Sequence, residues 1–107
     1  MINATDSALS AIKAFGTKIG VTANNIANMN TDGFKKSRVV LEEGHPSGVT
    51  VSIEEVNTPG AILPARDGSG ETRETSNVAL EEEVGNLITT RTAFSAVSYT
   101  HLRAHET

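Results

Sequence analysis

The sequence predicts a mainly α-helical chain with a small β region, in which an N-terminal and a C-terminal helix pack as a coiled-coil-like hairpin. Two stretches without proline place apolar residues at helical spacing, and all three prolines lie between them. The length of 107 residues predicts one domain or less. Because only 4% of the residues are aromatic, the core is expected to be thin and its stability to depend on partners.

The first helix is expected from about Ala4 to Met29. Its apolar residues follow two interleaved seven-residue series, which is the pattern of a coiled coil over about three repeats. The series are Ile12, Ile19 and Ile26, and Ala8, Phe15, Thr22 and Met29, with Thr22 as a polar gap. Gly16 and Gly20 lower its helix propensity by about 1 kcal/mol each relative to alanine, so the helix is not expected to be stable alone.

A stop signal follows near residues 28–30, because asparagine tolerates the left-handed conformation that ends helices. The next residues, Thr31 to Gly33, have the composition of a tight turn, and Phe34 is placed just past it. We therefore assign residues 1–33 to the N-terminal helix and its turn.

The middle segment, residues 34–75, is expected to form short strands and loops. Residues 38–41 and 61–63 are short strand candidates, and residues 49–54 alternate between apolar and polar side chains as a strand does. Residues 66–75 are polar and glycine-containing, which predicts a flexible loop.

The second helix is assigned to residues 76–97, with Ser76 or Asn77 as its cap and residues 81–83, three glutamates, as a solvated first turn. Residues 98–107 do not continue the apolar stripe, and we interpret them as an atypical tail. Two origins stay open for it: a segment foreign to the rest of the chain, or a frayed polar terminus. The seam between the two helices is predicted to contain Ile12, Phe15, Ile19, Ile26, Leu80, Val84, Leu87 and Phe94.

Composition argues against several classes of function. The formal net charge of −4 disfavours non-specific nucleic-acid binding, and the absence of cysteine excludes disulfides, thiolate zinc sites and a cysteine nucleophile. No apolar run reaches the roughly 20 residues of a membrane helix, and the N-terminus has no pattern of a cleavable signal peptide. No catalytic or metal-ligating set is visible, so we expect neither an enzyme nor a cofactor.

Two segments resemble the signatures of the bacterial flagellar rod and hook proteins. Residues 21–35, VTANNIANMNTDGFK, are similar to the N-terminal pattern A-N-N-[IL]-A-N-x-N-T-x-G-[FY]-[KR]. Residues 75–90, TSNVALEEEVGNLITT, are similar to the C-terminal pattern S-N-V-[DN]-[LP]-x-x-E-[ML]-x-x-[LM]-I, although Ala79 stands where the family usually has Asp or Asn. The short middle segment resembles the rod proteins more than the hook proteins, which carry large inserted domains.

The resemblance implies a structural subunit of the flagellar basal-body rod, the hollow drive shaft of motility. Its partners would be other rod and hook–basal-body proteins and further copies of itself. It would be exported without a cleavable signal by the flagellar type III apparatus and would lie in the rod that spans the periplasm. The signature residues expected to serve assembly are Asn24, Asn25, Ile26, Ala27, Asn28, Asn30, Thr31, Gly33 and Phe34.

Two alternatives stay open for these residues. The asparagines can bond the backbone of adjoining subunits or satisfy only their own turn. Phe34 is expected to be a local core residue, with an anchor between subunits as the other possibility.

A rival function uses the same apolar stripes. A cytosolic helical-hairpin adaptor or chaperone-like module would hold one partner helix against them. Concentration-dependent fibre formation discriminates the two hypotheses, because an adaptor saturates at a fixed stoichiometry.

Overall fold

The computed structural model describes residues 2–45 and 47–106 and confirms the expected fold class: two helices with a small antiparallel β region between them. Met1 and Thr107, the outer bounds of the predicted segments, lie outside the described residues. The elements in chain order are α1 (Ile2–Ala27), β1 (Ser37–Glu43), β2 (Val49–Glu55), β3 (Ile62–Pro64), β4 (Thr72–Glu74) and α2 (Leu80–Glu106).

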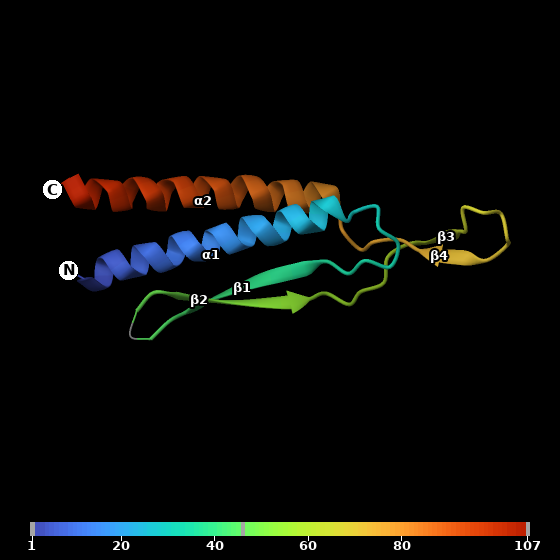
Figure 1. Ribbon diagram of the computed structural model, residues 1–107, viewed down its shortest axis with the longest axis horizontal. Helices are drawn as coiled ribbons and strands as arrows, with labels where there is room; N and C mark the ends of the chain where they lie inside the picture. The colour runs from blue at the N-terminus through green and yellow to red at the C-terminus, as the bar shows by residue number, and fades with distance from the viewer. Residues whose placement is uncertain (1, 46, 107) are drawn as a thin grey trace.

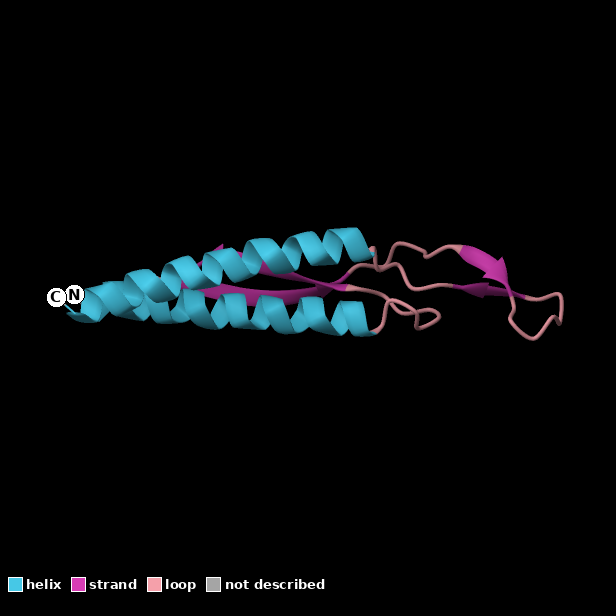
Figure 2. Ribbon diagram, turned by 90° about the horizontal axis from the view of Figure 1, so that it is seen from above, coloured by secondary structure: helices cyan, strands magenta, loops and turns pink. Residues whose placement is uncertain are grey.

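The molecule is an elongated rod measuring 67 × 24 × 14 Å, in which α1 and α2 run antiparallel (Figure 1). Figures 1 and 2 together show that the helices cross: they overlap in one view near the two termini and in the other view near the opposite end. This arrangement fits the coiled-coil-like hairpin expected from the heptad spacing.

The middle segment forms two separate hairpins. Strands β1 and β2 pair antiparallel, with Val39 opposite Ile53, and fold back along α1. Strands β3 and β4 pair as a second, shorter hairpin that extends beyond the helices (Figure 1). The two hairpins therefore differ in position: the first lies beside the helical pair, and the second extends past its end. Residues 72–74 were predicted to belong to a loop but form strand β4. Three residues are too few to show the alternation of apolar and polar side chains that predicts a strand.

The helix boundaries differ from the sequence prediction at the C-terminal side. Helix α2 begins at Leu80, a few residues after the predicted cap, and continues to Glu106, so the predicted end at Val97 is wrong. Residues 98–106 contain neither proline nor glycine, so the helix continues although the apolar stripe does not. The foreign origin of this tail stays a prediction.

The seam of the helical pair is narrow and largely polar. Among the described side chains, Ala14 is the buried hydrophobic residue, at 1% exposure. The buried polar residues are Thr22, Asn25, Ser76, Glu83 and Thr90. On α2, Glu83 and Thr90 lie seven residues apart and mark the buried stripe.

The predicted seam residues differ in burial. Ile12, Phe15, Ile19, Ile26, Leu87 and Phe94 are half-buried. Leu80 and Val84 are instead 43% and 39% exposed, which corrects the prediction that they line the seam within one chain. The reason is that Glu83 occupies the buried side of this part of α2.

Candidate functional site

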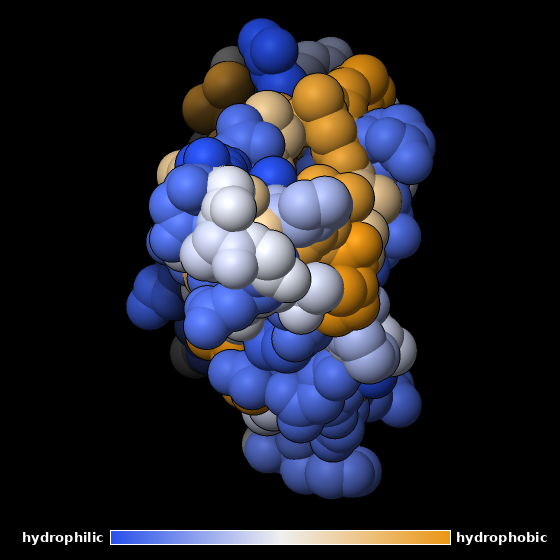
Figure 3. Space-filling model, turned by 90° about the vertical axis from the view of Figure 1, so that its right-hand side faces the viewer, coloured by the Kyte–Doolittle hydropathy of each residue, from blue (hydrophilic) through white to orange (hydrophobic). Residues whose placement is uncertain are grey.

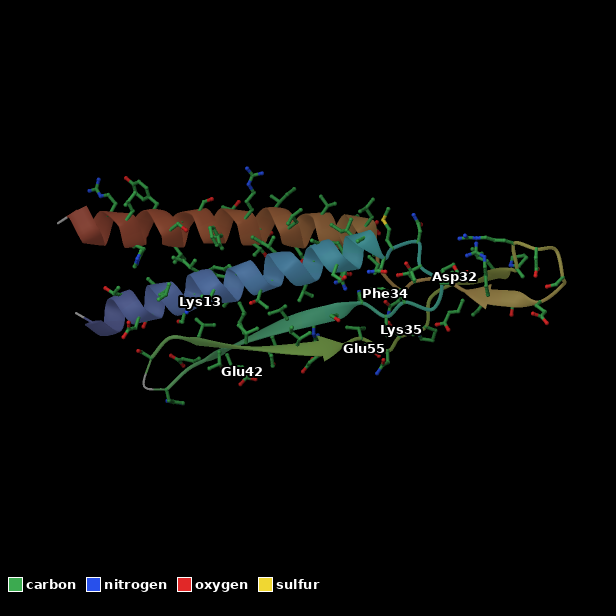
Figure 4. All side chains as sticks on the ribbon, in the orientation of Figure 1. Lys13, Asp32, Phe34, Lys35, Glu42 and Glu55 are labelled. Carbon is green, nitrogen blue, oxygen red and sulfur yellow. The ribbon has the colours of Figure 1, made fainter. Side chains whose placement is uncertain are left out.

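The two signature segments meet in space where α1 ends and α2 begins. We call this region the signature junction; it consists of Asn25, residues 33–37, residues 74–77 and Glu83. In Figure 4 the labelled Phe34 and Lys35 belong to the junction, and the labelled Asp32 lies next to it. Its contacts join α1, β1 and α2, and the middle segment separates α1 from α2 in the sequence.

Asn25 is the central residue of the junction. Its side-chain amide donates hydrogen bonds to Oε1 of Glu83 at 2.5 Å and to the carbonyl of Ser37 at 2.8 Å. Its side-chain oxygen accepts the backbone N–H of Ser37 at 3.0 Å, so the carboxamide pairs with the edge of β1 as a neighbouring strand would. Asn25 is 2% exposed and Glu83 is 3% exposed, so this contact is shielded from water.

Asn77 has a similar role at the other side of the junction. Its side-chain oxygen accepts the backbone N–H of Lys36 at 2.7 Å. Its amide donates to the carbonyls of Val56 at 2.8 Å and Thr58 at 2.9 Å, and its own N–H donates to the carbonyl of Phe34 at 3.2 Å. This single side chain therefore closes the open end of the β1–β2 hairpin.

Backbone contacts and an ion pair complete the junction. The N–H of Gly33 donates to the carbonyl of Glu74 at 2.9 Å, and Gly33 has a φ of +73°, which favours glycine at that position. Lys35 forms an ion pair with Glu74, whose carboxylate also accepts the N–H of Gly60 at 3.0 Å. The bond from Lys35, followed by that from Gly60, lowers the pKa of Glu74 below its ordinary value of 4.5.

A second ion-pair group attaches the outer hairpin to the signature turn. Asp32 accepts a hydrogen bond from Arg73 of β4 at 2.8 Å, and Arg66 lies 3.9 Å from the same carboxylate. Because these groups are partly exposed, such pairs contribute little to stability and mainly orient the hairpin.

A groove of about 390 Å³ lies beside the junction, between α1, β1 and α2. Its charged side chains include Lys36, which pairs with Glu82 at 3.1 Å, and Arg38, which pairs with Glu54 of β2 at 2.6 Å. Within the described ranges, no three His, Cys, Asp or Glu side chains are grouped so that they would hold a metal ion. The arrangement is suited to holding helices and strands together.

The structure distributes the predicted signature residues among different roles. Asn25 is engaged within the chain, whereas Asn28 donates to the carbonyl of Asn24 at 3.0 Å and accepts from Thr31 at 3.1 Å, within its own turn. Gly33 shapes the turn, and Phe34 and Ile26 are half-buried. Asn24, Ala27 and Asn30 are exposed. A contact of any of them with another subunit stays a prediction.

Sequence reasoning missed two residues of the junction. Glu83 was expected to lie in a solvated first turn but is buried against Asn25, while Glu81 and Glu82 are exposed as expected. Asn77 was, with Ser76, one of two residues expected to cap the helix, but its side chain bonds the β1–β2 hairpin. The sequence signal that could have identified both residues is the C-terminal signature, which has Asn and Glu at the positions of Asn77 and Glu83.

In the part of the chain that the structure describes, neither helix combines the length and the apolar character needed to cross a bilayer.

Comparisons with known proteins agree with the signature segments. The family model described as "Flagella basal body rod protein" matches residues 6–35. The flagellar basal-body rod protein FlgG of Bacillus subtilis (strain 168) is 51% identical over 43 residues, which are 40% of this chain. The flagellar hook protein FlgE of Borreliella burgdorferi (strain ATCC 35210 / DSM 4680 / CIP 102532 / B31) is 31% identical over 70 residues, which are 65% of this chain.

The matched part of the chain spans 16% of the length of each of these two relatives. The family match covers α1 from residue 6 onward and the turn after it, which together carry the N-terminal signature. Through this segment, the chain is similar to flagellar basal-body rod and hook proteins.

Proposed function

We propose that the chain is a structural subunit of the flagellar basal-body rod that assembles with copies of itself and with other axial proteins. The observation that carries the proposal is the signature junction, in which two segments far apart in the sequence meet. Asn25 of α1 bonds Glu83 of α2 across the antiparallel helical pair, and Asn77 bonds the backbone of Lys36. A subunit of a shaft needs such a rigid, elongated unit, and the chain has that shape.

The distribution of apolar side chains supports assembly. A chain with this little buried apolar side-chain surface gains stability when neighbouring copies cover its outer faces. Exposed apolar residues on α2 include Leu80, Val84 and Ile88, which a neighbouring subunit would cover. Folding and assembly are therefore expected to be coupled: the helical pair becomes fully ordered when it joins the rod.

The route and the location follow from the proposed role. The subunit would pass through the flagellar type III export apparatus without a cleavable signal peptide, and would lie in the part of the rod that spans the periplasm. Its contribution would be mechanical, with no bound cofactor and no catalysed reaction.

Peptide mass spectrometry of purified hook–basal bodies from the bacterium that encodes the chain tests the proposal. We expect peptides from residues 4–91 to be enriched there relative to a whole-cell digest. The same spectra would report whether residues 98–107 occur in the assembled protein. Peptides found in the soluble cytoplasmic fraction and absent from the basal bodies would contradict the rod function and favour the adaptor.

A second test uses the purified chain. Sedimentation at increasing concentration should show growing, polydisperse assemblies, because a rod subunit adds further copies without a fixed limit. A chain that remains a stable helical monomer at high concentration would count against the proposal.

A further inference from the structure

Helix α2 carries an apolar ridge on its outer side. Leu80, Val84 and Ile88 are spaced by four residues, so they follow one side of the helix, and they are 43%, 39% and 61% exposed. The buried residues Glu83 and Thr90 lie on a different side of the helix. The ridge is therefore separate from the stripe that faces α1 of the same chain, and its side chains remain exposed.

Helix α1 has an exposed face that is complementary in shape. Gly16 and Gly20 lie one turn apart, and a Cβ atom added at either would meet no atom within 4 Å. Both are exposed, as are Ala23 and Ala27 farther along the helix. Large side chains of one helix pack well into the shallow surface left by small residues of another, as ridges fit into grooves.

The charges beside the two surfaces have opposite sign. Exposed Glu81 and Glu82 flank the start of the ridge, in the first turn of α2. Exposed Lys13 lies next to the glycine face of α1 (Figure 4 labels Lys13). Opposite charges bring the two surfaces together and disfavour contacts between two ridges or between two glycine faces.

The same chain cannot make this contact with itself. Ala14 is buried at 1% exposure on the side of α1 that faces the interior, and the two exposed glycines lie on the outer side. A contact between two different surfaces of identical chains is heterologous, and it continues into an open assembly when its rotation does not close a ring.

We propose that the ridge of Leu80, Val84 and Ile88 on α2 packs onto the Gly16–Gly20 face of α1 in a second copy of this chain, head to tail. The proposal rests on the self-assembly proposed above and names the two surfaces that make it. Figure 3 shows that hydrophobic side chains form an exposed band on the end of the molecule from which β3 and β4 project, so apolar surface is available to neighbours there as well.

Directed cross-linking tests the contact, because the chain contains no cysteine and every introduced thiol is unique. One full-length chain would carry Gly20→Cys and the other Val84→Cys, with a mass label on one of them. After mixing at assembling concentration and mild oxidation, the mixed disulfide should exceed either homodimeric disulfide at least about tenfold. The matched control replaces Val84→Cys with Gly85→Cys, an exposed neighbour with open space that points to another side of α2.

A second variant separates docking from folding. Gly20→Leu raises the helix propensity of α1 but fills the face, so sedimentation should show a loss of assembly while circular dichroism shows helix content kept or increased. Assembly of the parent chain without the mixed disulfide, or with Gly85→Cys cross-linking as well as Val84→Cys, overturns this contact and leaves the rod function standing. Absence of any assembly by the parent chain overturns both.

Discussion

The helical pair is held together differently at its two ends. At the signature junction, polar side chains make directed bonds to backbone atoms, and Asn25 alone joins α1 to both β1 and α2. Toward the termini, the buried residues are Ala14 on α1, which has a small side chain, and Thr90 on α2, whose hydroxyl has no hydrogen-bond partner. The junction therefore specifies the register of the helices, while the rest of the pair depends on packing.

The largest effect is expected from breaking the junction at Asn25. Asn25→Ala leaves the buried carboxylate of Glu83 without its donor and the backbone of Ser37 without its partner, so we expect a loss of about 3 kcal/mol in the free energy of unfolding. Urea denaturation followed by circular dichroism measures it. Asn24→Ala, next to it but exposed, should cost less than about 0.5 kcal/mol. Equal losses for the two variants would contradict the role of Asn25.

A smaller loss of stability is expected from a substitution at Gly60, at the edge of the junction. A Cβ atom at this position would lie 1.9 Å from the carbonyl oxygen of Thr75, which is backbone and has little room to move. Gly60→Ala should therefore destabilise the chain by about 2 kcal/mol. The control is Gly16→Ala, where a Cβ meets nothing within 4 Å and helix propensity predicts a gain of about 1 kcal/mol. A shift in the urea midpoint in the same direction for both would refute the steric argument.

The other end of the pair should respond in the opposite direction. Thr90→Val keeps the shape of the side chain and removes a buried hydroxyl that has no partner, so we expect stabilisation by about 1 kcal/mol. Thr92→Val, whose hydroxyl bonds the carbonyl of Ile88 at 3.0 Å and is exposed, should change little. Thermal melting of both variants would measure the difference. A loss of stability in Thr90→Val would indicate that its hydroxyl is hydrogen-bonded in solution.

The smallest expected effect is a pH dependence at the junction. Because the pKa of Glu74 is lowered in the folded chain, its stabilising contribution is fully present above about pH 4.5. It is lost as the pH falls through the lowered folded pKa, when the ion pair with Lys35 breaks. The difference in urea midpoint between the parent chain and Glu74→Gln should therefore shrink on acidification. Glu71→Gln, on an exposed side chain, serves as the control, and a difference that stays constant down to pH 3 would contradict this contribution.

The elements with a strong local signal could be predicted from the sequence. The heptads of α1, the alternation in residues 49–54 and the turn at Thr31 to Gly33 each follow from local spacing, and the structure contains the corresponding helix, strand and turn. Strand β4 could not be predicted, because its three residues are strand only through pairing with β3.

The junction was harder to predict because it depends on tertiary contacts. The carboxamides of Asn25 and Asn77 behave as strand partners, although asparagine is ordinarily read as a residue of turns and helix ends. Glu83 follows two exposed glutamates in the sequence, and its pairing with Asn25 makes its burial favourable. The buried stripe of α2 contains polar residues, Glu83 and Thr90, so it gives no periodic apolar signal. Leu80 and Val84 were assigned to the seam because they are apolar residues at helical spacing, although they lie outside this stripe.

The base of the outer hairpin is closed by a short pair of bonds: the N–H of Thr75 donates to the carbonyl of Ala61 at 2.8 Å, and the hydroxyl of Thr75 accepts the N–H of Ala61 at 2.9 Å. The two ends of the outer hairpin therefore lie next to each other, just before the chain enters α2. The tip of this hairpin, between Pro64 and Thr72, can therefore be lengthened or exchanged without removing Glu74 from the junction or Arg73 from its ion pair with Asp32. This makes the tip a suitable site for attaching a reporter or for evolving a new domain beside an unchanged helical pair.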